Sequence, residues 1–302
     1  QGGSDEAKWA YNNLQAQVDY GFRATHVTTL AGKAITEHFY ARTPAKSYFM
    51  GCSGGGLQGL SEAQRFPWDY DGIIAGAAPP GGLTQRSVVA DLWTYLNAQD
   101  SAGKPVLTKS DVEFLHRKVV AKCDDNDGVK DGLIGDPRFC KFDPSELACG
   151  TGECLSAQKI DTIKKIYSGP TAPGATDFAG QTLGSELGWL VPIGGAGYIG
   201  HAKEGMRYLF LDPAPGPKWD VKDFDVARDF KRFGVFHALG AADNPDLRKF
   251  KAAGGKLIMF VGWADRARPL TNVDYYETVE RVMGGRAGTQ DFLRLFTIPG
   301  MA

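Results

Sequence analysis

The sequence has no long apolar run and no excess of charge of one sign. Its 302 residues include 34 lysines and arginines against 35 aspartates and glutamates, so no overall field attracts nucleic acid or an anionic membrane. No stretch approaches the roughly 20 apolar residues that a membrane-spanning helix needs. We therefore expect no nucleic-acid partner and no membrane partner. With 43% hydrophobic residues, the chain can bury one large domain, or a domain with a large insertion.

Cysteine is also scarce, and its placement is uneven. Four of the five cysteines lie between residues 123 and 154: Cys123, Cys140, Cys149 and Cys154. This clustering suits local disulfides formed in an oxidising compartment. The alternative is a zinc site, but the cluster contains neither C-x-x-C spacing nor a histidine. Two bridges would leave Cys52 over, and an odd cysteine in a secreted type of protein suggests that its partner is missing.

Strand and helix patterns alternate near both ends of the sequence. Apolar residues recur at helical spacing or in short buried runs, with glycine or proline at the stops, in residues 24–39 (helix), 46–53 (strand), 56–66 (helix), 70–80 (strand), 254–265 (strand), 272–285 (helix) and 291–301 (strand). This order is typical of a parallel α/β sheet. Residues 83–250 lack the alternation, so we predict a sheet core from residues 1–82 and 251–302, interrupted by a large insert.

A glycine-rich turn follows the first predicted strand. Residues 51–55, GCSGG, satisfy G-x-S-x-G between a strand and a helix, where that motif holds a serine nucleophile. Ser53 would sit in a strained turn whose neighbours are glycines because side chains do not fit there. The N–H of Gly54, at the start of a helix, can stabilise an oxyanion. A purely structural turn is the alternative, since the motif also arises by chance among 39 glycines.

A serine nucleophile needs an acid and a histidine base, in the chain order Ser, Asp, His. Asp265 follows the strand at 256–261, where the acid is expected, and a solvated loop aspartate is the alternative. The histidine belongs after the final strand, but the five histidines all lie elsewhere: His26, His38, His116, His201 and His237. We expect packing or surface roles for the first two. His201 and His237 lie in the insert, where we expect a structural role before a contact with substrate.

Together these residues resemble the tannase and feruloyl esterase family, which includes the mono(hydroxyethyl) terephthalate hydrolase type. The matching segments are QGGSDEAKWA, YFMGCSGGGLQGLSEAQRFPWDYDGIIAGAAP, CDDNDGVKDGLIGDP, GGKLIMFVGWAD and RLFTIPGM. The resemblance implies an α/β-hydrolase core with an inserted lid domain at residues 83–250. It also implies that Ser53 is the nucleophile, Asp265 the acid and Gly54 an oxyanion donor. In the family the cysteine before the serine pairs with a cysteine after the histidine, so Cys52 resembles half of that bridge.

The sequence departs from the family pattern at three places. It ends at Ala302, just after PGM, where the family has His-Cys, and it lacks the long segment that family chains carry before QGG. Asp265 is followed by Arg266, where a proline is expected. The chain also begins without methionine, so we expect a processed or incomplete copy that, as written, is a poor catalyst or none. Its own first residues do not show whether it is secreted.

Residues 123–133, CDDNDGVKDGL, concentrate aspartates among glycines. Hard oxygen ligands in a tight turn suit calcium, and a solvated acidic turn is the alternative. The resemblance implies a structural calcium ion that rigidifies the lid, held by the carboxylates of Asp124, Asp127 and Asp131 and the carbonyls of Val129 and Leu133. It further implies two bridges, Cys123–Cys140 around this loop and Cys149–Cys154 nearby.

The resemblance therefore implies a secreted or periplasmic serine hydrolase of small aromatic esters, of the hydroxycinnamic or gallic type, that acts through an acyl-enzyme. Four aromatic residues of the insert are candidates to line the acyl pocket, although we expect more of them in the core: Trp189, Tyr198, Phe210 and Trp219. A non-catalytic, calcium-stabilised fragment or binding module is the alternative, since the triad histidine is absent from the sequence. A peptidase or acyltransferase is another, because a triad does not fix the substrate.

Overall fold

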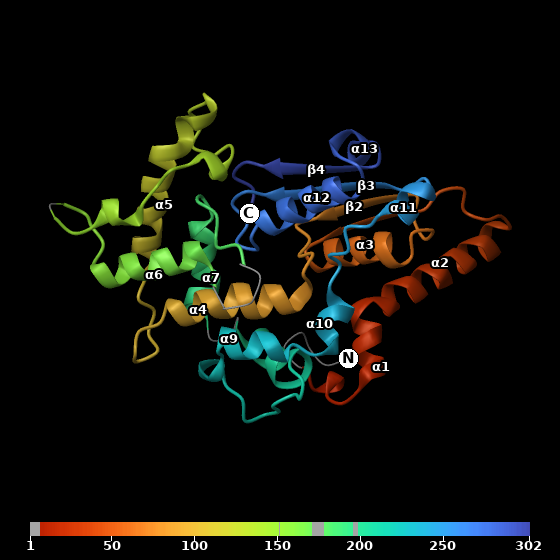
Figure 1. Cartoon of the computed structure of the whole chain (residues 1–302), viewed down its shortest axis with the longest axis horizontal. Coiled ribbons are helices and arrows are strands. Elements are labelled where there is room, and N and C mark those ends of the chain that lie inside the picture. The colour runs from red at the N-terminus through yellow and green to blue at the C-terminus, as the bar shows by residue number, and fades with distance from the viewer. Residues whose placement is uncertain (1–6, 151, 171–177, 196–198) are drawn as a thin grey trace.

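The computed structural model describes residues 7–150, 152–170, 178–195 and 199–302. Four parallel strands form one sheet in the order β1-β2-β3-β4 (Figure 1): β1 (Tyr48–Cys52), β2 (Gly72–Gly76), β3 (Lys256–Gly262) and β4 (Leu293–Ile298). The predicted parallel α/β sheet is thus confirmed. Its two halves come from distant parts of the chain, because Gly72 in β2 pairs with Lys256 in β3.

The predicted helices beside the sheet are present as α2, α3 and α12. The bounds of the α-helices are α1 (Leu14–Val18), α2 (Ala24–Tyr40), α3 (Gly54–Arg65), α4 (Trp93–Asn97), α5 (Lys109–Cys123), α6 (Ala157–Ser168), α7 (Leu190–Gly194), α8 (Gly200–Gly205), α9 (Val226–Asp229), α10 (Val235–Gly240), α11 (Arg248–Ala252), α12 (Leu270–Val282) and α13 (Arg286–Gln290). Three segments are π-helical: Asp19–Arg23, Thr84–Leu92 and Met206–Phe210. Short 3-10 turns span Lys8–Ala10, Asp124–Asp127, Pro137–Phe139, Pro144–Leu147, Glu186–Trp189, Val221–Asp223 and Phe230–Arg232.

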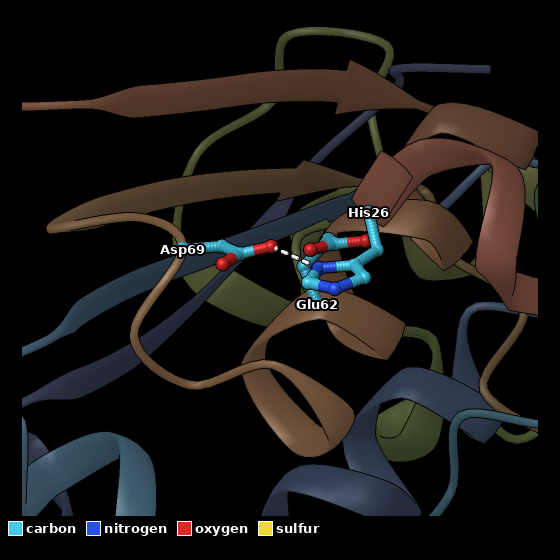
Figure 2. A group of neighbouring side chains, drawn as sticks. All are labelled: His26, Glu62 and Asp69. Carbon is cyan, nitrogen blue, oxygen red and sulfur yellow. Dashed lines mark hydrogen bonds and ion pairs between the residues drawn. The ribbon is translucent and has the colours of Figure 1, made fainter. Parts of the chain in front are cut away.

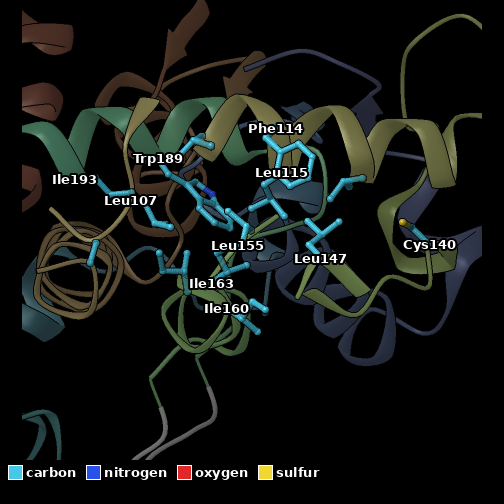
Figure 3. Packing of buried hydrophobic residues seen from close by; sticks show 14 of the residues in the cluster. Leu107, Phe114, Leu115, Cys140, Leu147, Leu155, Ile160, Ile163, Trp189 and Ile193 are labelled. Atoms are coloured by element: carbon cyan, nitrogen blue, oxygen red, sulfur yellow. The ribbon is translucent and has the colours of Figure 1, made fainter. Parts of the chain in front are cut away.

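The insert has a hydrophobic core of its own (Figure 3). Leu115 of α5, Ile163 of α6 and Trp189 are fully buried there. The hydroxyl of Thr108 accepts a bond from the N–H of Asp111, and the Asp111 carboxylate accepts one from the N–H of Thr108, so a capping box fixes the start of α5. Two disulfides fasten this region: Cys123–Cys140 and Cys149–Cys154. They are the pairs that the resemblance implied.

A second core lies at the sheet, where Leu57 and Leu60 of α3 pack with Ile73 of β2 and Leu257 of β3. A third contains Phe210 and Trp219 of the insert. Of the aromatic residues proposed as pocket liners, Trp189, Phe210 and Trp219 are therefore core residues, as expected of most of them, and Tyr198 lies outside the described residues.

The edge of the sheet formed by β1 carries exposed apolar side chains. β1 is an edge strand with exposed Tyr48 and Met50, and Ile35 and Phe39 of α2 are exposed as well. The apolar spacing in residues 24–39 therefore predicts the helix correctly, although its apolar residues are not buried. In the part of the chain that the structure describes, no helix is both long enough and apolar enough to cross a membrane.

Candidate active site

Ser53 occupies a sharp turn between β1 and α3. Its backbone angles, φ +57° and ψ −116°, lie in a region that residues other than glycine rarely adopt. Its N–H donates to the carbonyl of Gly76 at 2.8 Å, and its carbonyl accepts from the N–H of Leu57 at 3.0 Å. The strained backbone is therefore held by β2 on one side and by the first turn of α3 on the other. This turn sets the half-buried serine at the carboxyl edge of the sheet.

Two of the neighbouring glycines are required by close backbone contacts. A Cβ on Gly51 would lie 2.5 Å from the carbonyl carbon of Gly55, and a Cβ on Gly56 would lie 2.3 Å from the carbonyl oxygen of Gly76. Gly54 and Gly55 have open space instead, so the steric reason given by the motif does not apply to them. The N–H of Gly54 begins α3, where helical amides have no carbonyl partner within the helix.

Asp265 leaves the same edge of the sheet as Ser53. It follows β3, its N–H donates to the carbonyl of Gly262 at 3.2 Å, and its Oδ1 accepts from the N–H of Ala267 at 2.7 Å. Because β2 alone separates β1 from β3, the two strand ends lie two strand spacings apart, about 10 Å. A histidine ring with a hydrogen bond on each nitrogen is of the size that bridges such a gap.

The insert is bound directly to the loop that carries Asp265. The hydroxyl of Thr182 donates to the carbonyl of Trp263 at 2.9 Å, and the side-chain amide of Gln181 donates to the carbonyl of Arg266 at 2.9 Å. The guanidinium of Arg266 lies 3.2 Å from the buried carboxylate of Asp91. Arg266 stands where the family pattern has proline, and the sequence offered no signal for these pairings, because the partners lie far apart along the chain.

Three histidines lie beside carboxylates. The pairs are His26 with Asp69 at 2.6 Å, His116 with Glu186 at 2.7 Å and His201 with Asp91 at 3.5 Å. Burial lowers the pKa of a fourth, His237. Every histidine of the chain precedes β3 in sequence.

The segment after β4 returns to the acid loop. The N–H of Trp263 donates to the carbonyl of Ile298 at 2.9 Å, and the N–H of Ala264 donates to the carbonyl of Met301 at 3.0 Å. A Cβ on Gly262 would lie 2.0 Å from the Met301 oxygen, so the two segments are in close contact. The residues that follow β4 thus lie beside the loop that carries Asp265.

Cavities flank the acid loop on two sides. One of about 360 Å³ is lined by Ala267, Arg268 and Tyr275, and one of about 160 Å³ by His116, Ala264 and Gly300. Arg268 is buried, which lowers its pKa to about 10, and its guanidinium donates to the carbonyl of Val89 at 3.1 Å. The larger cavity therefore has a cationic group in its wall.

The acidic loop folds around Asp124. Its buried Oδ1 accepts from the N–H groups of Asp131 at 3.1 Å and Gly132 at 2.9 Å. Asp127 and Asp131 likewise accept, through Oδ1, from the N–H groups of Val129 and Leu133. Among the described residues, the three side chains with atoms able to ligate a metal that gather within 4.8 Å of one another are those of His26, Glu62 and Asp69, so the loop carboxylates are more widely spaced. A calcium ion there would need the backbone carbonyls as well.

Cys52, directly before Ser53, is exposed and has a free thiol. Its position directly before Ser53 is that of the bridging cysteine in the family pattern that the sequence resembles.

The family model described as tannase and feruloyl esterase matches residues 1–197 and 212–302. The chain belongs to this family. The matched ranges include Ser53, the acidic loop and Asp265.

This member of the tannase and feruloyl esterase family is similar to several curated proteins. It is 32% identical to a mono(2-hydroxyethyl) terephthalate hydrolase of Piscinibacter sakaiensis, over 95% of this chain and 56% of that protein. It is 31% identical to a probable feruloyl esterase B-2 of Aspergillus flavus, over 97% of this chain and 56% of that protein. The chain thus spans little more than half the length of these relatives.

Solved structures agree on the fold. The crystal structure of feruloyl esterase B from Aspergillus oryzae superposes with a TM-score of 0.85 at 28% identity, over 98% of this chain and 60% of that one. A tannin acyl hydrolase from Aspergillus niger gives a TM-score of 0.75 at 22% identity, over 98% and 60% of the two chains. The predicted α/β-hydrolase fold is confirmed.

Proposed function

We propose that this protein is a serine carboxylic ester hydrolase that cleaves small esters of aromatic acids through an acyl-enzyme. The observation that carries the proposal is the strained conformation of Ser53, held between β1 and α3 at the sheet edge from which Asp265 also emerges. The printed names of the relatives, feruloyl esterase and mono(2-hydroxyethyl) terephthalate hydrolase, support the choice of aromatic esters.

Three residues of this chain take part in the proposed reaction: Ser53, Gly54 and Asp265. The Ser53 oxygen attacks the ester carbonyl carbon, and the N–H of Gly54 donates to the oxyanion that forms. The alcohol leaves, the acyl group remains on Ser53, and a water molecule then releases the acid. Asp265 accepts a hydrogen bond from the histidine that takes and returns the proton, and so keeps that ring in the correct tautomer.

None of the five histidines in the 302 residues follows β3, so the base of the triad is not assigned to a residue of this sequence. A histidine joined shortly after Met301 would enter beside Asp265, since Met301 already bonds to Ala264. The chain without such a histidine is expected to turn over esters slowly, because general-base assistance contributes roughly 10²–10⁴-fold. Imidazole in solution should then restore part of the rate.

We also propose a structural calcium ion in the acidic loop. The donor set fits: Asp124, Asp127 and Asp131 supply carboxylates, Val129 and Leu133 supply carbonyls, and calcium prefers such hard oxygen ligands. Among the described hydrogen bonds, each of the three carboxylates uses only its Oδ1 atom, so the Oδ2 atoms are the candidate ligands. The ion would stiffen the insert and take no part in the ester chemistry.

A location outside the cytoplasm, secreted or periplasmic, is part of the proposal. Its support is the pair of disulfides, Cys123–Cys140 and Cys149–Cys154, because such bridges persist in oxidising compartments.

The test is ester turnover by the purified protein. Methyl ferulate, methyl gallate and mono(2-hydroxyethyl) terephthalate should be assayed with and without imidazole, in the wild type and in Ser53→Ala, alongside the intact mass. Imidazole-stimulated hydrolysis that Ser53→Ala abolishes supports the proposal, and the preferred ester identifies the acid. Binding of these esters with no turnover in either condition would favour a non-catalytic binding module.

A further inference from the structure

A buried cluster of one imidazole and two carboxylates lies away from Ser53, between α2 and α3 (Figure 2). His26 of α2 places its Nδ1 2.6 Å from Oδ2 of Asp69, in the loop before β2. Glu62 of α3 lies beside both, and the ligating atoms of the three residues fall within 4.8 Å of one another. Glu62 and Asp69 are each only 1% exposed. The His26 side chain is 19% exposed, so the cluster joins three segments through two buried carboxylates and one partly exposed imidazole.

Glu62 is the unsatisfied member of this cluster. Neither of its carboxylate oxygens has a hydrogen-bond donor among the described residues. An ionised carboxylate buried without donors, beside a second carboxylate, is strongly disfavoured. Either a cation or a proton must compensate it.

The other charged groups around the cluster are few. Lys33 of α2 donates to the carbonyl oxygen of Asp69 and lies over the ring of Tyr70, whose hydroxyl is bonded to Thr29. Arg65 of α3 points elsewhere, since its guanidinium lies over the ring of Phe22 and donates to carbonyls near α10. The ammonium of Lys33 is thus the one lysine charge close to the cluster in the described structure.

The geometry favours a proton over a metal ion. Two ligands of one zinc ion, each about 2.0–2.1 Å from the metal, lie about 3.3 Å apart in a tetrahedral site. The 2.6 Å separation between His26 and Asp69 is shorter and is that of a hydrogen bond. The ammonium of Lys33 would also repel a divalent cation. His26 Nδ1–H therefore donates to Asp69, which leaves Asp69 as the acceptor for a proton on Glu62.

We propose that Glu62 is protonated in the folded protein and donates to Asp69, so that Glu62, Asp69 and His26 form a pH-sensitive latch joining α2 to α3. The face of His26 stacks on Phe66 at a ring separation of 3.7 Å, which holds the imidazole in the plane that the latch requires. Because Ser53 is the residue directly before α3 and Glu62 lies in the last turn of that helix, the latch fixes the end of α3 that is far from Ser53.

The pH dependence follows from the same contacts. Burial, and next the charge of Asp69, raise the pKa of Glu62 to about 8, from an ordinary value of 4.5. Between these two pH values the folded protein binds one more proton at Glu62 than the unfolded chain does. Stability supplied by the latch is therefore complete below about pH 4.5, declines as the pH rises, and is lost above about pH 8.

The experiment compares thermal unfolding of the wild type, Glu62→Gln and Glu113→Gln from pH 5 to pH 9. Glutamine imitates the protonated acid, and Glu113, a partly exposed glutamate of α5, serves as the control. We expect the Tm of the wild type and of Glu113→Gln to fall by several degrees towards pH 9. The Tm of Glu62→Gln should fall much less over this range, so that at pH 9 it is higher than the Tm of the wild type. A Glu62→Gln protein that is destabilised equally at all pH values would overturn the proposal.

Two measurements on the wild type need no variant. A ¹³C NMR titration should show the Glu62 carboxyl carbon titrating near pH 8, and a midpoint in the ordinary glutamate range contradicts the latch. Elemental analysis should find no stoichiometric metal that depends on these residues. A zinc or manganese ion that is bound to the wild type and lost in Glu62→Gln would contradict the proposal and show that the cluster is a metal site.

Discussion

The N–H of Ala264 donates to the carbonyl of Met301 at 3.0 Å, so the segment after β4 lies against the loop of the candidate catalytic acid. The contact leaves no space at Gly262, where a Cβ would lie 2.0 Å from the Met301 oxygen. One neighbouring residue of Ala264 is Asp265. Any base carried by this segment would therefore be positioned by backbone contacts with the acid loop itself.

Gly262→Ala should disturb this contact. We expect it to lower the free energy of unfolding by about 1–3 kcal/mol, because the added methyl group overlaps a backbone carbonyl that cannot move freely. Chemical denaturation measures the change. Gly32→Ala on α2 is the control: a Cβ there has open space, so alanine should be neutral or stabilise by up to about 1 kcal/mol. Equal effects of the two substitutions would refute the close contact.

Ser53→Gly should separate strain from catalysis. Glycine adopts φ +57° and ψ −116° readily, so we predict a gain of about 1 kcal/mol in the free energy of unfolding, together with loss of ester turnover. Ser53→Ala should lose turnover as well but keep the strained backbone. A Ser53→Gly protein less stable than Ser53→Ala would show that the turn is not strained in solution.

Calcium should stabilise the acidic loop. We predict that millimolar calcium raises the Tm of the wild type and that EGTA reverses the rise, while Asp127→Asn weakens the response because it removes one carboxylate ligand. Asp161→Asn, an exposed aspartate of α6 outside the loop, is the matched control and should respond as the wild type does. If calcium does not change the Tm of the wild type, the loop is a solvated acidic turn and the calcium proposal is wrong.

The two disulfides should contribute unequally. Cys123–Cys140 spans 17 residues and Cys149–Cys154 spans 5. From the loss of chain entropy in the unfolded state, we expect replacement of both cysteines of a pair by serine to cost about 3 kcal/mol for the longer loop and about 2 kcal/mol for the shorter one. Urea denaturation of the two double variants gives the order, and a larger loss for the short loop would contradict it.

Much of the sheet region could be predicted because its signals are local. A short apolar run stopped by glycine or proline predicts each of β1, β2 and β3. The glycine turn at Ser53 is recognisable because it lies between a strand and a helix. Each of these elements is recognisable within about fifteen residues. The position of Asp265 follows from the end of its strand.

The contacts around the site could not be predicted, because they join distant residues. Arg266 meets Asp91 across 175 positions, and Glu186 meets His116 across 70. Neither pair has any local pattern. The same holds for the core of the insert, where residues of α5 and α6 that are far apart in sequence pack around Trp189.

The most direct test of the account asks whether Ser53 becomes acylated. The wild type, Ser53→Ala and Cys52→Ala are incubated with p-nitrophenyl ferulate, whose good leaving group allows attack even with weak base assistance, and the adduct is located by peptide mass spectrometry. The Cys52→Ala variant separates the serine from the exposed thiol beside it. One feruloyl group on Ser53 in the wild type and in Cys52→Ala, and none in Ser53→Ala, is the predicted result. An adduct that disappears with Cys52, or no adduct at all, would contradict the assignment of Ser53 as the nucleophile.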